Sequence, residues 1–147
     1  MPNWCNNELR ISGPAEAIAK FKQQAIGFNP WSMPPKDEEP SLLNFHSLVP
    51  IPADVLKADY ARVGHDWEVK HWGTRWGACD VQLVEETDHV LCYHFDTAWA
   101  PAVEFIRHAR QLWPTLTFIL DYDEPGMGYK GLCKGQGEHF EDHRITY

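Results

Sequence analysis

The chain is 147 residues long and 44% apolar, which is enough for one domain with a hydrophobic core and too little for two. Its formal net charge of −8 repels a phosphate backbone, and its lysines and arginines are scattered, so nucleic-acid binding is not expected. No apolar run reaches the ~20 residues that a membrane-spanning helix needs, so no association with a membrane is expected either.

The four cysteines, Cys5, Cys79, Cys92 and Cys133, are far apart in the sequence. Zinc ribbons need cysteines in local C-x-x-C pairs, which are absent, and no secretion signal indicates a disulfide framework. We therefore expect reduced, mostly buried thiols in a cytoplasmic protein. No cofactor and no tightly bound metal are expected.

The first forty residues predict a strand, a helix and a long loop. Residues 4–12 alternate in polarity, and the drier face is expected to consist of Cys5, Asn7, Leu9 and Ile11. The following helix is expected to start at Pro14, which suits a first helical turn, and to end at Gly27. Residues 28–41 are rich in proline and acidic at the centre, which predicts a long loop with a mobile centre.

Short helical segments are expected in the next part of the chain. The prolines Pro50 and Pro52 interrupt a short extended segment, because proline cannot donate to a strand ladder. A helix is expected at about residues 53–61. One or two further helical turns are expected at residues 65–72, and Gly73 ends them.

The central part of the chain predicts an antiparallel hairpin. Residues 79–83 and 91–95 each alternate in polarity and are joined by a turn at residues 87–88, so one face of the hairpin is buried. A helix is expected next, and it stops before Pro114. Further strands are expected at residues 115–123 and 129–134.

The predicted order is strand, helix, strand, strand, helix, strand, which is that of a ferredoxin-like α+β sandwich with two helices on one face of an antiparallel sheet. We expect a single domain over residues 1–147, with a long insertion after the first helix at about residues 28–78. This insertion is expected to cover a sheet edge or the bare sheet face. The expected core includes Leu9, Ile11, Ile18, Phe21, Leu91, Tyr93, Phe95, Ile106, Leu116, Phe118 and Leu120.

Four blocks of the sequence are distinctive: PNWCNN at residues 2–7, WGTRWGA at 72–78, FDTAWAP at 95–101 and YDEPGMG at 122–128. In this order, along nearly the whole chain, they resemble a family of uncharacterised phage- and plasmid-borne proteins that is described as having a ferredoxin-like domain. The resemblance supports the predicted fold and implies no particular chemistry. Residues 28–41 match no pattern of this family.

The blocks WGTRWGA and FDTAWAP are expected to lie side by side, since an antiparallel hairpin brings the start of one strand beside the end of the other. Trp76 and Trp99 should then be neighbours, with Arg75 and Asp96 close enough to pair. An arginine beside exposed indole rings is common on recognition surfaces. The candidate binding residues are therefore Trp72, Arg75, Trp76, Asp96 and Trp99. The alternative is that the tryptophans are buried anchors and that the arginine and the aspartate lock the loop.

A first group of polar residues lies on the predicted sheet. His94 and Asp96 are on the same strand face, where Arg10 and Asp121 can join them from neighbouring strands. A histidine beside a carboxylate suits acid–base work or metal binding. The alternative is that both are half-exposed polar residues paired with Arg10.

A second group lies near the end of the sequence. His139 and His143 share a face if this part is helical, where they can bind a divalent metal. In a strand they line one side together with Glu141. A surface-exposed tail without a function is the simpler interpretation.

Three functions stay open. The tryptophan-rich blocks favour a non-catalytic interaction module that binds a protein partner. The second is a small metal-dependent enzyme that uses His94, Asp96 and the tail histidines. The third is an acidic inhibitor that mimics DNA and blocks a host protein, although the only acidic runs are short, at residues 37–39 and 85–86. RNA binding is not expected, because no aromatic residue occurs among the assigned outward positions. These positions are Glu8, Arg10, Gln82, Cys92, His94 and Asp96.

Overall fold

The structure, a computed structural model, describes residues 1–32 and 39–147. The centre of the proline-rich loop, which the sequence predicts to be mobile, lies outside the described residues. The strands are β1 (Trp4–Ser12), β2 (Arg75–Glu86), β3 (Val90–Ala98), β4 (Thr117–Glu124), β5 (Tyr129–Gln136) and β6 (His139–Thr146). The α-helices are α1 (Ala15–Gln24), α2 (Phe45–Leu48), α3 (Ala53–Lys57), α4 (His65–Trp72) and α5 (Val103–Leu112). A short 3-10 turn (Pro30–Ser32) and a π-helical turn (Tyr60–Gly64) complete the described elements.

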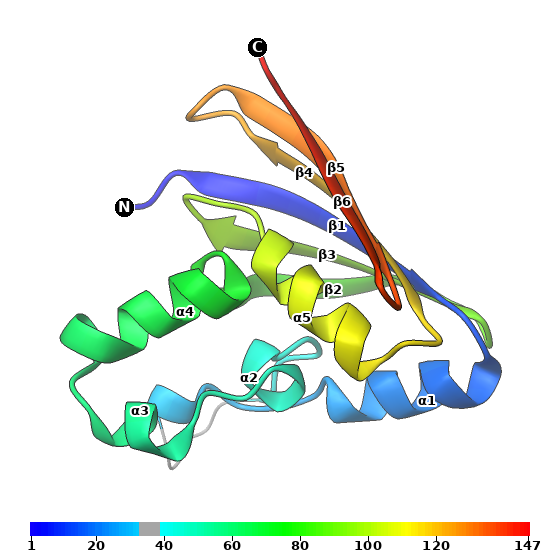
Figure 1. The fold of residues 1–147 in the computed structure, drawn as a ribbon, viewed down its shortest axis with the longest axis horizontal. Helices are drawn as coiled ribbons and strands as arrows, with labels where there is room; N and C mark the ends of the chain where they lie inside the picture. The colour runs from blue at the N-terminus through cyan, green and yellow to red at the C-terminus, as the bar shows by residue number, and fades with distance from the viewer. Residues whose placement is uncertain (33–38) are drawn as a thin grey trace.

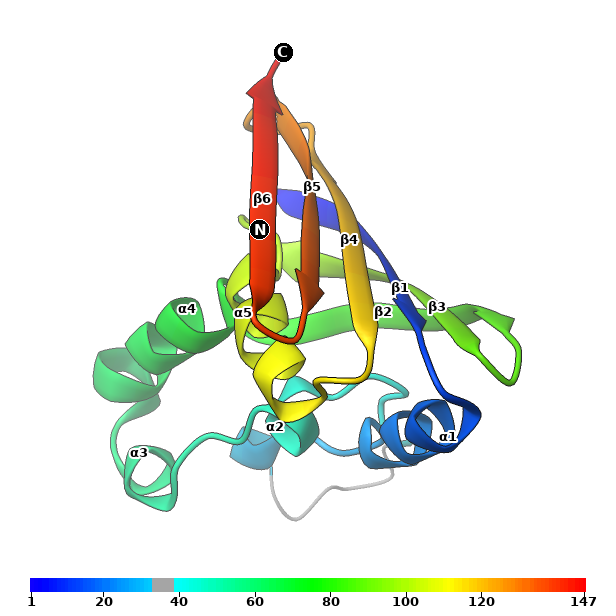
Figure 2. The same cartoon turned by 45° about the vertical axis from the view of Figure 1, so that its right-hand side comes forward.

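The six strands form one antiparallel sheet in the order β2-β3-β1-β4-β5-β6 (Figures 1 and 2). The first four strands, with α1 and α5 as the crossover helices, have the ferredoxin-like arrangement that the sequence predicts. Strands β1 and β3 are central, and their register places Leu9 opposite Tyr93. On the other side of β1, Leu9 lies opposite Leu120 of β4.

The buried face of the sheet agrees with the predicted alternation. All eleven predicted core residues are buried, and Phe95 is among them, so the predicted buried face of β3 is confirmed. Helix α1 contributes Phe21, whose ring makes edge-to-face contacts with Phe118 of β4 and with Trp113 after α5. The core therefore lies between the sheet and the helices on one side of it.

The insertion lies on the helical side of the sheet, where α2 and α4 contact the edge strand β2, so only the part of the expectation that placed it over the bare face is wrong. Phe45 of α2 stacks on Phe105 of α5, with the ring centroids 4.0 Å apart, and meets the rings of Phe95 and Trp72 edge to face. Further buried residues of the insertion are Leu43, Leu48, Val49 and Ile51. Figure 1 shows α2 beside α5 in the same layer. Among the residues that the structure describes, no helix lies on the opposite face of the central strands (Figures 1 and 2).

The end of the chain forms a strand rather than a loose tail. β6 pairs with β5 along its full length, from His139 opposite Gln136 to Thr146 opposite Tyr129. It forms the outer edge of the sheet in Figure 2. Most of its side chains are exposed, so the strand has no hydrophobic period that a sequence could reveal. Backbone hydrogen bonds hold it in place.

One histidine of the insertion makes folding sensitive to mild acid. Nδ1 of His46 accepts a hydrogen bond of 2.9 Å from the backbone N–H of Ile51, and burial lowers the pKa of His46. In the unfolded chain, His46 binds a proton below its usual pKa of about 6.5, whereas in the folded chain it stays neutral to a lower pH. The stability that neutral His46 contributes is therefore complete above about pH 6.5 and declines as the pH falls through its lowered pKa.

We expect the free energy of unfolding of the wild type to fall more steeply from pH 7 to pH 5 than that of His46→Asn. Asparagine offers an acceptor near the position of Nδ1 and does not titrate. Urea unfolding at several pH values measures both proteins, and the difference between them cancels the other titrating groups. If the free energies of unfolding of the two proteins change in parallel with pH, His46 is not the source of the acid sensitivity.

Candidate functional site

Three partly exposed tryptophans meet at one end of the central strands, and we call them the tryptophan cluster (Trp4, Trp76 and Trp99). Their exposed fractions are 37%, 45% and 38%. The ring centroids of Trp76 and Trp99 are 5.6 Å apart, as the hairpin geometry predicts, and those of Trp4 and Trp76 are 6.5 Å apart. Trp4 was not among the predicted binding residues. Its place at the start of β1, opposite Ala98, brings it to the same end.

The backbone of this cluster is strained. Trp76 has a φ of 68° and Trp99 a φ of 63°, in the left-handed region that bulky residues avoid at a cost of about 1–3 kcal/mol each. The Trp99 backbone is held from both sides. Its N–H donates to the carbonyl oxygen of Asn3 at 2.8 Å, and its carbonyl accepts from the Tyr129 hydroxyl at 3.2 Å. Such conformations persist only where the surroundings fix them.

A buried carboxylate fixes the backbone of Trp76. Glu68 of α4 is 1% exposed. Its Oε1 accepts hydrogen bonds from the Trp76 backbone N–H at 3.1 Å and from the Tyr60 hydroxyl at 2.7 Å, and its Oε2 accepts one from Trp31 Nε1 at 3.2 Å. No pattern in the sequence indicates this role, because Glu68 occupies an ordinary position in a short polar helix.

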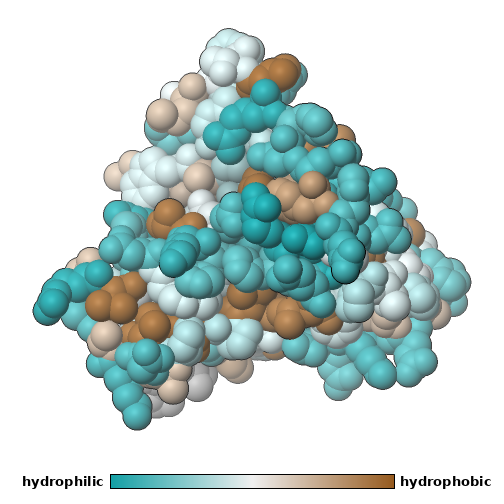
Figure 3. Space-filling model, viewed as in Figure 1, coloured by the Kyte–Doolittle hydropathy of each residue, from teal (hydrophilic) through white to brown (hydrophobic). Residues whose placement is uncertain are grey.

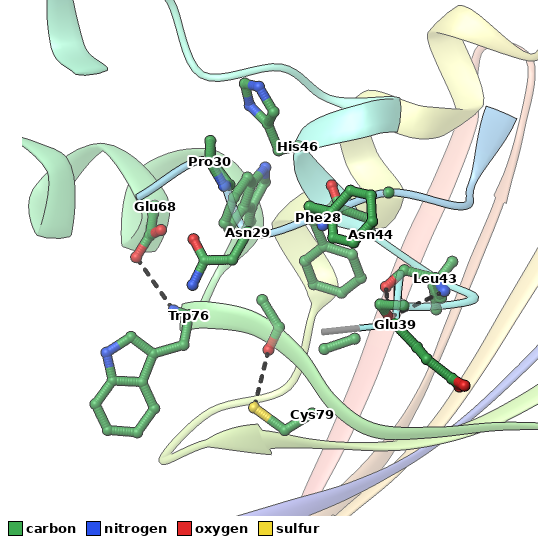
Figure 4. A pocket seen from close by; sticks show the side chains of 16 residues that line it. Phe28, Asn29, Pro30, Glu39, Leu43, Asn44, His46, Glu68, Trp76 and Cys79 are labelled. Atoms are coloured by element: carbon green, nitrogen blue, oxygen red, sulfur yellow. Dashed lines mark hydrogen bonds between the residues drawn. The ribbon is translucent and has the colours of Figure 1, made fainter. Parts of the chain in front are cut away.

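Figure 4 shows Glu68 reaching the Trp76 amide beside a cavity of about 270 Å³. Phe28, Asn44 and His46 line this cavity from the insertion, and Cys79 lines it from β2. The indole of Trp76 points away from the cavity. The carboxylate therefore ties the insertion to the start of β2 and leaves the tryptophan ring on the outer surface.

Arg75 and Asp96 do not pair as predicted. The guanidinium of Arg75 lies over the ring of Trp99, 5.1 Å from its centroid, and no ion pair joins Arg75 to Asp96 in the part of the chain that the structure describes. The ladder between β2 and β3 is irregular after Arg75, so that Asp96 lies opposite Cys79 instead. Burial, and then the neighbouring carboxylate of Asp80, raise the pKa of Asp96.

Trp72 does not belong to the exposed surface. It is buried in the core, where its Nε1 donates a hydrogen bond of 3.0 Å to the carbonyl oxygen of Val49. Helix α4 ends directly after it at Gly73, whose φ of 86° is the left-handed cap expected of glycine. For this residue the structure agrees with the alternative, a core anchor.

A shallow groove of about 300 Å³ extends the cluster towards α4. The residues that line it are Val69, Gly73, Thr74, Arg75, Ala98, Trp99 and Ala100. Val69 is itself partly exposed, so apolar groups continue from the indole rings into the groove. The view in Figure 3 shows mainly hydrophilic surface, interrupted by separate small hydrophobic patches.

The open face of the sheet is acidic. A groove of about 510 Å³ runs across it and is lined by Asn6, Asn7, Glu8, Asp80, Gln82, His94, Phe95, Asp96, Asp121 and Asp123. Five of these side chains are carboxylic acids, and they come from four strands. Only two short acidic runs are visible in the sequence, because residues that are distant along the chain become neighbours across the sheet.

His94 meets a glutamate on this face. Its Nε2 lies 3.4 Å from Oε2 of Glu8, the residue opposite it on β1. Arg10 instead pairs with Glu85 of β2 at 2.9 Å, so the interpretation in which Arg10 pairs with His94 or Asp96 is wrong. Asp121 of β4 lies opposite Glu8, on the other side of β1 from His94. Asp121 and His94 both line the acidic groove.

Cys92 was predicted to face outward, yet it is only 1% exposed. It lies between Arg10 of β1 and Glu85 of β2, and the ion pair between these two side chains covers it. Its thiol donates a hydrogen bond to Oε1 of Glu8, with Sγ and Oε1 3.6 Å apart. Burial, and then Glu8, raise the pKa of this thiol. Potential metal-binding atoms of Glu8, Cys92 and His94 all lie within 4.8 Å of one another.

The two tail histidines are on one side of β6, as the strand interpretation requires. Nε2 of His139 is 3.5 Å and Nε2 of His143 is 3.7 Å from Oε2 of Glu141. All three side chains are largely exposed, and they lie on the outermost strand.

Comparison with known proteins identifies the family. The model of a family described as the ferredoxin-like domain in Api92-like protein matches residues 71–145, which are just over half of the chain. The crystal structure of protein api92 from Yersinia pseudotuberculosis superposes with a TM-score of 0.74, covering 100% of this chain and 99% of that one, at 10% sequence identity. This likeness shows the fold alone.

Two other findings complete the comparison. No curated protein matches the sequence. Among the described residues, no helix combines the length and the apolar character that crossing a membrane requires. On the family match, the chain belongs to the family of the ferredoxin-like domain in Api92-like protein.

Proposed function

We propose that the protein is a non-catalytic interaction module, encoded by a phage or plasmid and acting in the cytoplasm, that binds a partner protein through the tryptophan cluster and Arg75. The observation that carries this proposal is that Trp76 and Trp99 are both exposed and both held in left-handed conformations. A structural anchor gains stability by being buried. These two rings are partly exposed on a backbone that costs stability, as is common at binding sites.

The composition of the surface supports a protein as the partner. Tryptophan and arginine are the residues most enriched among those that dominate protein–protein binding energy. The guanidinium of Arg75 lies over the Trp99 ring, which places a positive charge beside the exposed indole rings. The apolar groove beside it offers a pocket for a side chain of the partner.

A substitution in the cluster is expected to separate binding from folding. Trp99→Ala should keep the fold, because the ring is partly exposed, and should weaken binding of a host protein that the wild type retains. Truncation of a dominant interface tryptophan costs about 2 kcal/mol or more, or about 30-fold in Kd. Affinity capture identifies the partner, and calorimetric titration with the purified partner then measures Kd for each variant.

Leu112→Ala is the matched control, since it also shortens a large exposed apolar side chain, at the end of α5 and outside the cluster. It should bind as the wild type does. Unchanged circular dichroism and thermal unfolding must accompany the loss in Trp99→Ala. Equal affinity of the wild type and both variants would contradict the proposal.

A second candidate function uses the acidic face. The sheet gathers five carboxylic acids in one groove, which favours an inhibitor that mimics DNA and binds a basic host protein. Binding of this kind weakens steeply with salt and is competed by DNA. The double variant Asp96→Asn with Asp121→Asn would abolish it, whereas Trp99→Ala would leave it intact. The two candidates therefore give opposite results with the same set of variants.

A further inference from the structure

Three side chains with different donor atoms converge on the open face of the sheet. Cys92 and His94 are two residues apart on β3 and point to the same side, and Glu8 of β1 lies opposite His94. The carboxylate of Glu8 reaches both of them. Its Oε1 is 3.6 Å from Sγ of Cys92, and its Oε2 is 3.4 Å from Nε2 of His94.

Both separations, each from a different oxygen of Glu8, are close to those between neighbouring ligands of a tetrahedral zinc ion. Bonds of about 2.0 Å to oxygen or nitrogen and about 2.3 Å to sulfur, at tetrahedral angles, place neighbouring ligand atoms roughly 3.3–3.5 Å apart. All three groups lie within 4.8 Å of one another, so side-chain rotations can bring them to these separations around an ion. We propose that Glu8, Cys92 and His94 form a binding site for a divalent transition metal of the zinc class, with the remaining coordination position open to the acidic groove.

The donor set selects the metal. A thiolate with an imidazole and one carboxylate suits zinc and its neighbours, whereas magnesium and calcium require oxygen donors. On binding, the Cys92 thiol releases its proton to solvent, and its sulfur coordinates the ion as a thiolate. The bound site then carries two negative charges from the protein against the two positive charges of the ion.

The surroundings favour a cation at this place. Asp80, Asp96, Asp121 and Asp123 line the same groove, so a positive ion approaches through a negative field. Arg10 lies opposite Cys92 on β1, and its guanidinium is engaged by Glu85 at 2.9 Å. This ion pair also covers Cys92, which limits access of oxidants to the sulfur while Glu8 and His94 stay half exposed.

This site is separate from the tryptophan cluster and goes beyond the proposed binding function. It also departs from the sequence-based expectation of no tightly bound metal, which considered His94 with Asp96 and the tail histidines and did not consider Cys92 with Glu8. An open coordination position is what the alternative of a small metal-dependent enzyme requires.

Cobalt titration of the reduced protein, purified with a chelator and then freed of it, tests the proposal. Co²⁺ replaces zinc in such sites and reports a thiolate ligand through a sulfur-to-metal charge-transfer absorption band. We expect one Co²⁺ per chain, displaced by one equivalent of Zn²⁺. Cys92→Ser should remove the charge-transfer band, and His94→Ala should weaken binding at least about tenfold.

Two controls make the outcome specific. Cys79→Ser removes a thiol of the same sheet that is partly accessible and should leave the band unchanged, and His143→Ala tests the tail histidines on β6. His94→Ala removes a half-exposed side chain, so it remains informative if Cys92→Ser disturbs the fold. A wild type that binds less than one equivalent, a band that survives Cys92→Ser, or binding that depends on His143 and not on His94 would each overturn the proposal.

Discussion

Replacing Phe45 by alanine is expected to lower the free energy of unfolding by about 3–5 kcal/mol. The ring is buried between three elements that are far apart in the sequence. It stacks on Phe105 of α5 and meets Phe95 of β3 and Trp72 of α4 edge to face. Removing it leaves a cavity that the sheet, α4 and α5 cannot all close at once. Aromatic contacts contribute further, by about 0.5–1.5 kcal/mol for each pair.

Urea unfolding followed by circular dichroism measures this loss. Leu42→Ala is the matched control, because Leu42 is a large apolar residue of the same insertion that is exposed. Its effect should stay within about 0.5 kcal/mol. A loss below about 1 kcal/mol in Phe45→Ala would show that the insertion is not part of the cooperative core, and the ferredoxin-like framework would then fold without it.

The buried face of the sheet was predictable because it follows from a local pattern. Side chains alternate between the two faces of a strand, and a shift of one residue exchanges the faces. The alternation in β1, β3 and β4 therefore determines which residues enter the core, and Leu9, Tyr93 and Leu120 meet where the pattern places them. The helices follow from the same apolar surface, since their stripes must cover it.

The features that were missed depend on contacts between distant segments. β6 lies at an edge and is mostly exposed, and it is held by backbone pairing with β5 and by contacts of single side chains such as Phe140 and Asp142, which leave no periodic pattern in the sequence. Cys92 faces outward as predicted, but its burial requires Arg10 and Glu85 to meet above it from two other strands. The placement of the insertion follows from the packing of Phe45 against α5, and the chain order alone does not determine it.

The candidate binding surface was half predictable. Antiparallel geometry makes Trp76 and Trp99 neighbours, and the structure agrees. The predicted pairing of Arg75 with Asp96 does not form. Two successive left-handed residues, Trp76 and Gly77, shift the register between β2 and β3, so that Asp96 lies opposite Cys79. Positive φ at tryptophan has no signal in the sequence, since its causes are remote hydrogen bonds.

The second large effect is expected from Glu68→Ala, which should lower the free energy of unfolding by about 3 kcal/mol or more. Three donors lose their acceptor at once, and each buried polar group without a partner costs about 1–3 kcal/mol. These donors are the Trp31 indole, the Tyr60 hydroxyl and the Trp76 backbone N–H. Because the last of them holds a strained residue, the tryptophan cluster should also lose its arrangement, and any binding through it should weaken.

Glu68→Gln keeps the size and shape of the side chain and removes its charge and one of its two acceptor oxygens. The side-chain oxygen of glutamine can still accept from Tyr60 and Trp76, but its amide N–H₂ then faces the N–H of Trp31, so that two donors meet. We expect Glu68→Gln to cost less than Glu68→Ala, by the two hydrogen bonds that it keeps. Trp31→Phe removes the opposing donor, so the cost of Glu68→Gln should shrink in that background.

A double-mutant cycle over Glu68→Gln and Trp31→Phe, measured by urea unfolding, gives the coupling directly. A favourable coupling of about 0.5–3 kcal/mol is the range found for residues that share a hydrogen bond. Additive effects of the two substitutions would mean that Glu68 does not accept from the indole in solution. Glu68→Ala and Glu68→Gln with equal losses would mean that the charge, and not the three hydrogen bonds, connects the insertion to the start of β2.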